Sequence, residues 1–123
     1  MVKQQFFMTL LTNKMKEEIS KNYPLYSQDG KQENAICVAK FFIGNYTWYI
    51  TEGNYEDGDF IMFGIFANGD EHEYGYVSLK EMESVNVKGF EIERDLHFDR
   101  QPLKEIKDSS LQNYLSHFYG EDN

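Results

Sequence analysis

The stretch Tyr46–Val77, YTWYITEGNYEDGDFIMFGIFANGDEHEYGYV, decides the fold of this chain. Its first part, Tyr46–Thr51, repeats with period two, which is the pattern of a half-buried strand. Phe60–Ala67 is apolar on both faces, which indicates a central strand covered on both sides or a covered subunit contact. Tyr74–Val77 predicts a further strand. The stretch therefore predicts three consecutive strands.

Turn signals separate these strands and join them to one more strand upstream. Ala35–Ile43 (AICVAKFFI) is rich in β-branched and aromatic residues, and Gly44-Asn45 after it fits a two-residue type II′ turn. Gly53–Asp59 predicts the next turn, and Asn68-Gly69 is the strongest short hairpin signal in the chain. Because each connection is short, we expect an antiparallel meander of four strands.

Two short helices are predicted from their capping residues. Thr12 is a good N-cap for a helix over 13–22, which Pro24 ends. Ser78 and Glu81 form a capping box for a short helix near 79–85. Both segments flank the strands in sequence, so we expect both to flank the sheet.

The C-terminal third adds one extended and one helical segment. Gly89–Phe98 is predicted to be a fifth strand, and 103–119 a helical segment whose final helix is capped by Asp108 or Ser109. With 35–98 as the sheet region, the chain reads as an α+β fold with a four- to five-stranded antiparallel meander sheet. Its length predicts one domain over 1–123.

The negative charge is unevenly distributed. The chain carries 12 Lys and Arg against 21 Asp and Glu, a formal charge of −9. No basic residue lies between Lys40 and Lys80. Binding to nucleic-acid backbones or anionic membranes relies on Lys and Arg, so we expect neither. The acids either keep an aromatic-rich protein soluble or face a basic partner protein.

The acids of this interval fall into two turns. Glu52–Asp59 is placed at one end of the sheet and Asp70–Glu73 at the other, separated by an eight-residue strand of about 26 Å. If a basic protein surface binds here, neighbouring tyrosines are suitable anchors. The candidate partner-binding residues are Glu52, Tyr55, Glu56, Asp57, Asp59, Asp70, Glu71, Glu73 and Tyr74.

The segment 91–99 is the densest cluster of chemically active side chains. In an extended conformation, Glu93, Asp95 and His97 share one face, where they are suitable ligands for a divalent metal in an enzyme. The alternative is a structural role, in which Arg94 pairs with a carboxylate and His97 hydrogen-bonds inside the fold. Trp48 is likewise predicted to pack against the sheet rather than to stack on a base.

Other catalytic or cofactor signals are missing from the sequence. Cys37 is the only cysteine, lies in an apolar strand and predicts a buried thiol, which suits a reducing, cytoplasmic compartment. Neither a phosphate-binding glycine loop nor a serine nucleophile elbow is present. We therefore expect a protein that is not an enzyme and has no cofactor, with the segment around His97 as the one alternative.

Four pieces of the sequence together resemble a known family. They are Thr47-Trp48-Tyr49 with Thr51-Glu52, Met62-Phe63-Gly64, Glu73–Leu79 and Ile92–Phe98. Their order and spacing, over roughly residues 10–103, resemble a domain-of-unknown-function family of small bacterial proteins carried on plasmids, conjugative elements and phages. The chain departs from that pattern by a helix predicted after Pro102.

The resemblance implies a role rather than a reaction, since the family has no established catalytic residues. Some of its members are regarded as anti-CRISPR proteins that restrain an RNA-guided, DNA-cleaving effector. By this resemblance, we expect an inhibitor of a host defence nuclease in the bacterial cytoplasm. Its partner would be a basic protein surface, such as that of a CRISPR effector ribonucleoprotein.

Overall fold

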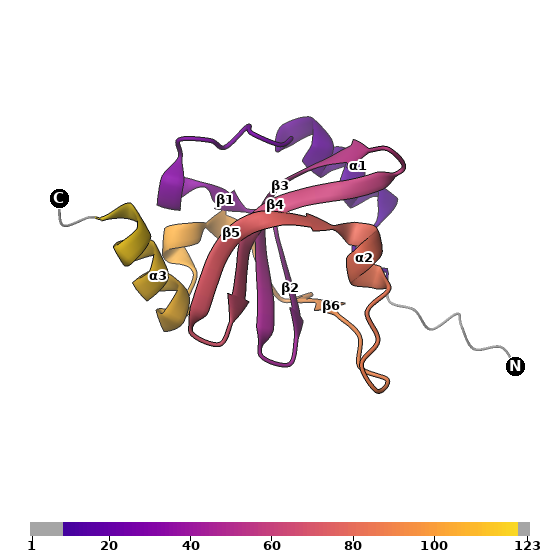
Figure 1. Ribbon diagram of the computed structural model, residues 1–123. Helices are drawn as coiled ribbons and strands as arrows, with labels where there is room; N and C mark the ends of the chain where they lie inside the picture. Colours follow the sequence, from indigo (N-terminus) through magenta and orange to yellow (C-terminus); the bar gives the residue numbers. More distant parts are fainter. Residues whose placement is uncertain (1–8, 121–123) are drawn as a thin grey trace, which may run out of the picture.

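The computed structural model describes residues 9–120 and contains an open, five-stranded antiparallel sheet with short helices (Figure 1). Its strands are β2 (Ala39–Ile43), β3 (Tyr46–Glu56), β4 (Asp59–Asn68), β5 (Glu71–Ser78) and β6 (Glu93–Arg94). They lie in the order β5-β4-β3-β2-β6. The strands β2 to β5 form the predicted meander, and β6 adds the fifth strand beside β2. The α+β fold class is confirmed.

The three α-helices begin at their predicted caps. They are α1 (Asn13–Asn22), α2 (Leu79–Glu83) and α3 (Ser109–Tyr119). Thr12 Oγ1 accepts from the Met15 N–H, and Ser78 Oγ accepts from the Glu81 N–H. The Asp108 carboxylate accepts from two N–H groups of the first turn of α3. Each cap satisfies backbone donors that the helix itself leaves free.

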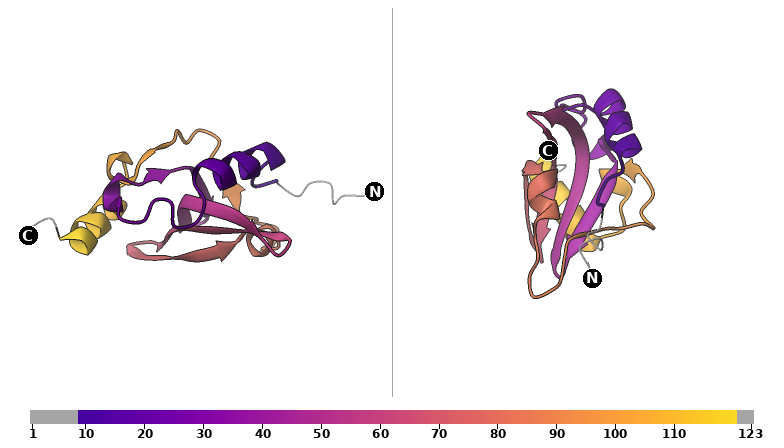
Figure 2. Two further views of the ribbon diagram at one scale, coloured as in Figure 1. Left: turned by 90° about the horizontal axis from the view of Figure 1, so that it is seen from above. Right: turned by 90° about the vertical axis from the view of Figure 1, so that its right-hand side faces the viewer.

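The core consists of two clusters, and β4 contributes to both. Met62 packs with residues of α1 and α2, whereas Ile65 packs with Leu103 in η3 (Leu103–Glu105) and with α3. Both side chains are fully buried, and their odd spacing places them on opposite faces of the strand. At these two positions β4 is therefore covered on both faces, as predicted for a central strand. Figure 2 shows α1 and α3 at opposite ends of the molecule.

The predicted strand Ala35–Ile43 is divided in two, which corrects the sequence reading. Its first part, β1 (Ile36–Cys37), pairs with β7 (Gln101–Pro102) in a separate two-stranded sheet. The break falls at Val38, whose N–H donates to the Ile50 carbonyl and whose carbonyl accepts from Arg100 Nε. Only after Val38 does the chain join the main sheet.

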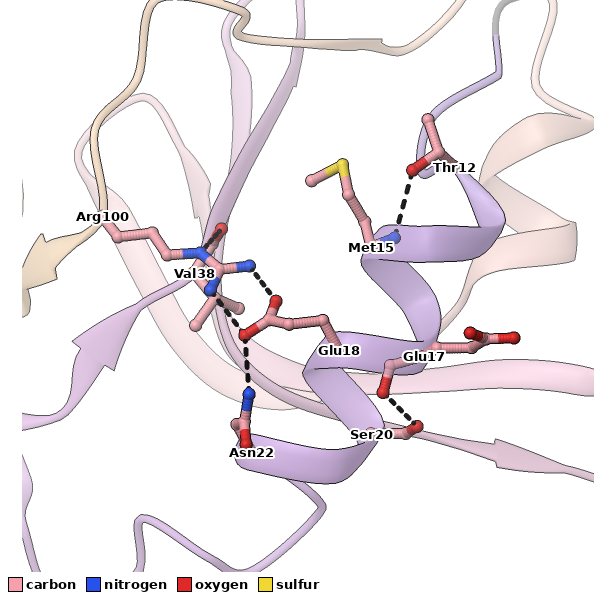
Figure 3. Close-up of polar contacts among 8 residues, drawn as sticks. All are labelled: Thr12, Met15, Glu17, Glu18, Ser20, Asn22, Val38 and Arg100. Atoms are coloured by element: carbon pink, nitrogen blue, oxygen red, sulfur yellow. Dashed lines mark hydrogen bonds and ion pairs between the residues drawn. The ribbon is translucent and has the colours of Figure 1, made fainter.

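Arg100 also holds α1 against this break. Its guanidinium forms a bidentate pair with Glu18, at 2.6 and 2.9 Å (Figure 3). The same guanidinium lies over the ring of Tyr23. Three segments far apart in sequence therefore meet at one side chain: α1, the β1–β2 junction and the irregular segment just before β7. Between α1 and β1 the chain forms the loop after Pro24 and the short helix η2 (Gln32–Asn34), which contacts η3 and α3.

The two turns that flank β4 differ from the prediction, the first in length and the second in position. The expected turn Gly53–Asp59 is wrong in extent, because β3 continues to Glu56 and only Asp57-Gly58 connects it to β4. Both turn residues have positive φ, +50° and +79°, as a type I′ turn requires. The next turn is centred on Gly69-Asp70 rather than Asn68-Gly69, since Asn68 pairs with Glu71.

The predicted fifth strand Gly89–Phe98 is also wrong in extent, since only Glu93–Arg94 pairs with the sheet. Before it, Val87 and Phe90 form a small bridge around a turn, and after it Phe98 N–H returns to the Asp95 carbonyl. Neither turn is part of the five-stranded sheet.

Within residues 9–120, no helix is long and apolar enough to cross a membrane.

Candidate functional site

The acids of the β3–β4 hairpin divide into exposed and structural residues. Glu56 and Asp57 are exposed at the turn, next to the half-exposed ring of Tyr55. Asp59 instead has a structural role, because its carboxylate accepts from Ser78 Oγ and from the Lys80 N–H at the start of α2. The hydrogen bond from Ser78 holds the pKa of Asp59 below its ordinary value. Asp59 is therefore tied to α2 rather than free for a partner.

The acids of the β4–β5 hairpin are exposed, but the predicted tyrosine beside them is not. Asp70, Glu71 and Glu73 all reach solvent. Tyr74 is half-buried, and its hydroxyl shares a hydrogen bond with that of Tyr119 on α3. Burial, followed by this hydrogen bond, raises the pKa of the Tyr74 phenol. Tyr74 therefore joins the sheet to α3.

Glu52 is in the interior, which corrects its placement among the surface acids. Only 3% of the residue is exposed. Its two carboxylate oxygens accept from the N–H groups of Tyr26 and Gln28, at 2.8 and 2.9 Å. The prediction placed Glu52 in the turn, but β3 continues to Glu56, so Glu52 lies within the strand, directly after a register shift between Ile50 and Glu52. Glu52 thus fixes the loop after α1 to the sheet.

The segment 91–99 does not assemble a metal site. Asp95 pairs with Lys40 at 3.6 Å and accepts from the His97 N–H, while Glu93 and the His97 ring are exposed. Within residues 9–120, no three His, Cys, Asp or Glu side chains converge to hold a metal ion. The extended face that would have aligned the acids is missing, because the chain turns directly after β6.

Arg94 is structural, but through a different contact from the one expected. Its Nε donates to the Leu10 carbonyl at 2.7 Å, rather than to a carboxylate. Leu10 itself is buried among the side chains of α1 and α2. The exposed ring of His97 also contradicts the expected hydrogen bond inside the fold. Arg94 therefore joins the start of the described chain to the sheet edge.

An apolar groove is the feature that the sequence analysis missed. It has a volume of about 740 Å³ and lies between the sheet, α2 and the segment that follows α2. Trp48, predicted to be structural, lies in its floor together with Phe66. The groove is lined by Ile43, Gly44, Tyr46, Trp48, Phe66, Val77, Glu81, Met82, Val85, Val87, Phe90 and Ile92.

The sequence contained only part of the signal for this groove. Tyr46 and Trp48 have the spacing of one strand face, which is compatible with either core or surface. The other wall comes from Val85 to Ile92, for which the sequence predicts the end of a helix at Val85 and a strand from Gly89 onward. In the structure this segment turns at a bridge between Val87 and Phe90 after α2. The β3 face that carries Tyr46 and Trp48 then stays open as the groove.

The fold and these surfaces define a small α+β protein with exposed acidic turns and an apolar groove. The chain belongs to the family described as protein of unknown function DUF2958, which matches residues 10–110. This agrees with the resemblance to a domain-of-unknown-function family. No curated protein and no solved structure matches the chain.

Proposed function

We propose that this protein is a non-catalytic interaction module of a mobile genetic element that inhibits a host defence nuclease in the bacterial cytoplasm. The inhibited enzyme would be a CRISPR effector ribonucleoprotein or a similar nuclease. The protein would bind a basic surface that normally holds nucleic acid. Competition for that surface requires acidic groups that are not already neutralised within the inhibitor itself.

One observation carries this proposal. Glu56 and Asp57 at one turn, and Glu71 and Glu73 near the other, are exposed and form no ion pair within residues 9–120. The two groups are separated by β4, whose ten residues extend for about 33 Å. Two unneutralised acidic ends at this spacing can contact an extended basic channel along its length.

Affinity capture from a host lysate, with and without nuclease treatment, tests the choice of partner. Recovery of a defence ribonucleoprotein, followed by inhibition of its DNA cleavage by the purified chain, supports the proposal. Loss of the captured protein after nuclease treatment would instead show that nucleic acid bridges the two, against direct binding.

A charge-reversal variant tests the surface. Glu56, Asp57, Glu71 and Glu73 are changed together to lysine, and a control variant carries lysine at Glu17, Asp29, Asp99 and Glu105. All eight positions are exposed, so both variants change the net charge equally. We expect the first variant to lose inhibition and the control to retain it. Equal inhibition by both variants would contradict the role of the two turns.

A further inference from the structure

The groove beside α2 collects exposed apolar side chains in one place. Phe90 is 71% exposed, Val87 56% and Tyr46 43%, and all three line it. Large apolar side chains scattered over a surface need no explanation, but a contiguous group around a concavity is typical of a binding site. The volume of about 740 Å³ is within the range of sites that bind a ligand or several side chains.

The floor of the groove continues into a second hollow across the sheet. This hollow, of about 270 Å³, shares Trp48, Phe66 and Val77 with the groove and extends over Gly64 and Gly75. The two glycines are paired across β4 and β5, and a Cβ added at Gly75 would meet no atom within 4 Å. The space left open at Gly75 extends the groove into an elongated apolar depression, whereas at Gly64 the backbone of Tyr49 and Ile50 occupies the place that a Cβ would take.

The charges at this depression favour a positively charged binding partner. Of residues 9–120, Glu81 is the only charged one that lines the groove, and Glu73 the only charged one that lines the hollow. Neither forms an ion pair within the described residues. Near apolar surface a carboxylate attracts a cation more strongly than in bulk water. A second copy of this chain, with its own charge of −9, is a poor complement to these acids.

We propose that the groove binds an amphipathic, basic helix of the partner protein. Apolar side chains at helical spacing would occupy the groove over Trp48 and Phe66, and a Lys or Arg would pair with Glu81. This inference rests on the proposed function, because it assigns the binding partner of an interaction module. The acidic turns would provide charged contacts with the partner, and the groove would add a contact that buries apolar area.

Trp48 is the only tryptophan of the chain, so its fluorescence reports directly on the groove. The probe is a peptide of about 14 residues, made of Leu and Lys with Leu at helical spacing and without Trp. We expect saturable binding with a shift of the Trp48 emission to shorter wavelength. A peptide with Glu in place of Lys, and one of scrambled order, should bind much more weakly.

Matched variants locate the binding. Phe90→Ala should weaken binding about tenfold, as for an anchor residue at an interface. Glu81→Gln should weaken it about two- to fivefold, as expected for one exposed charge pair, whereas Glu83→Gln on the same helix should leave it unchanged. Phe90 and both glutamates are exposed, so the three variants are expected to fold.

Three results would overturn the inference. They are equal binding of the Lys and Glu peptides, binding that neither Phe90→Ala nor Glu81→Gln weakens, and a stable homodimer in sedimentation that protects Trp48. Peptide binding without capture of a nuclease would contradict the proposed function but support the groove. If both Phe90→Ala and Glu81→Gln still capture the nuclease and no peptide binds, the proposed function would be supported and the groove contradicted.

Discussion

The hydroxyl of Tyr49, in the middle of β3, donates a hydrogen bond of 2.5 Å to Oδ2 of Asp108, 59 positions further along the chain. The other oxygen of Asp108 accepts from the N–H groups of Ser110 and Leu111. One carboxylate therefore caps α3 and fixes its start to the sheet. Burial, followed by the bond to Asp108, raises the pKa of the Tyr49 phenol.

Removing either partner should destabilise the fold to different extents. Asp108→Ala removes the helix cap and leaves the Tyr49 hydroxyl without its acceptor, so we expect a loss of about 2–3 kcal/mol. Tyr49→Phe removes only one hydrogen bond and should lower the free energy of unfolding by about 1 kcal/mol. Urea unfolding of both variants and the double variant measures these values. Strict additivity in the double variant would show that the bond contributes nothing to stability.

The helix caps and the β-hairpins were predictable, because both depend on residues close together in sequence. Thr12, Ser78 and Asp108 each cap a helix within three positions, and the turns before β3 and after β4 carry glycine. The division at Val38 and the interior placement of Glu52 were not predictable, since both depend on contacts with distant segments. The groove was missed for the same reason, because its walls are more than 30 positions apart in sequence.

Glu52 should matter for the loop after α1 rather than for partner binding. In Glu52→Gln an amide NH₂ replaces one oxygen and faces a backbone N–H, so the donor there loses its acceptor. We expect a loss of stability of about 1–3 kcal/mol. The anchored loop contains Lys31, so trypsin should cleave the variant there faster than the parent protein.

Inhibition by a Glu52→Gln variant should stay unchanged at a temperature where the variant is folded. Glu56→Gln, in the exposed turn of the same hairpin, is the matched control for the cleavage assay, and it should be cut at the parent rate. Equal protection of Lys31 in all three proteins would show that Glu52 does not hold the loop.

Cys37 should be inert in the folded protein. The residue is fully buried, and burial raises the pKa of its thiol to about 12. The thiolate is the reactive form, so at pH 8 both its scarcity and its inaccessibility oppose modification. A chromogenic disulfide reagent should react with one thiol per chain in urea and with almost none under native conditions. A Ser116→Cys variant, with its exposed position on α3, is the positive control. Rapid modification of the parent protein without urea would contradict the burial of Cys37.

Acid should destabilise this protein through three carboxylates. Glu18 and Asp59 have lowered pKa values, chiefly through hydrogen bonds from Arg100 and Ser78 respectively. Asp108 also has a lowered pKa, because the bonds from Tyr49 and two N–H groups outweigh the effect of its burial. The unfolded chain therefore takes up these protons first as the pH falls.

The contribution of these three carboxylates to the free energy of unfolding should thus be constant above about pH 5 and decrease as the pH falls through the range of the lowered pKa values. Arg100→Gln removes the cause of the Glu18 shift, so its stability should fall less steeply over this range, from a value about 1 kcal/mol lower at pH 7. Lys107→Gln is the control, since Lys107 is exposed and forms no ion pair within residues 9–120. Denaturant unfolding at a series of pH values measures each slope. Parallel profiles for Arg100→Gln and the parent protein would show that the bidentate pair does not lower the pKa of Glu18.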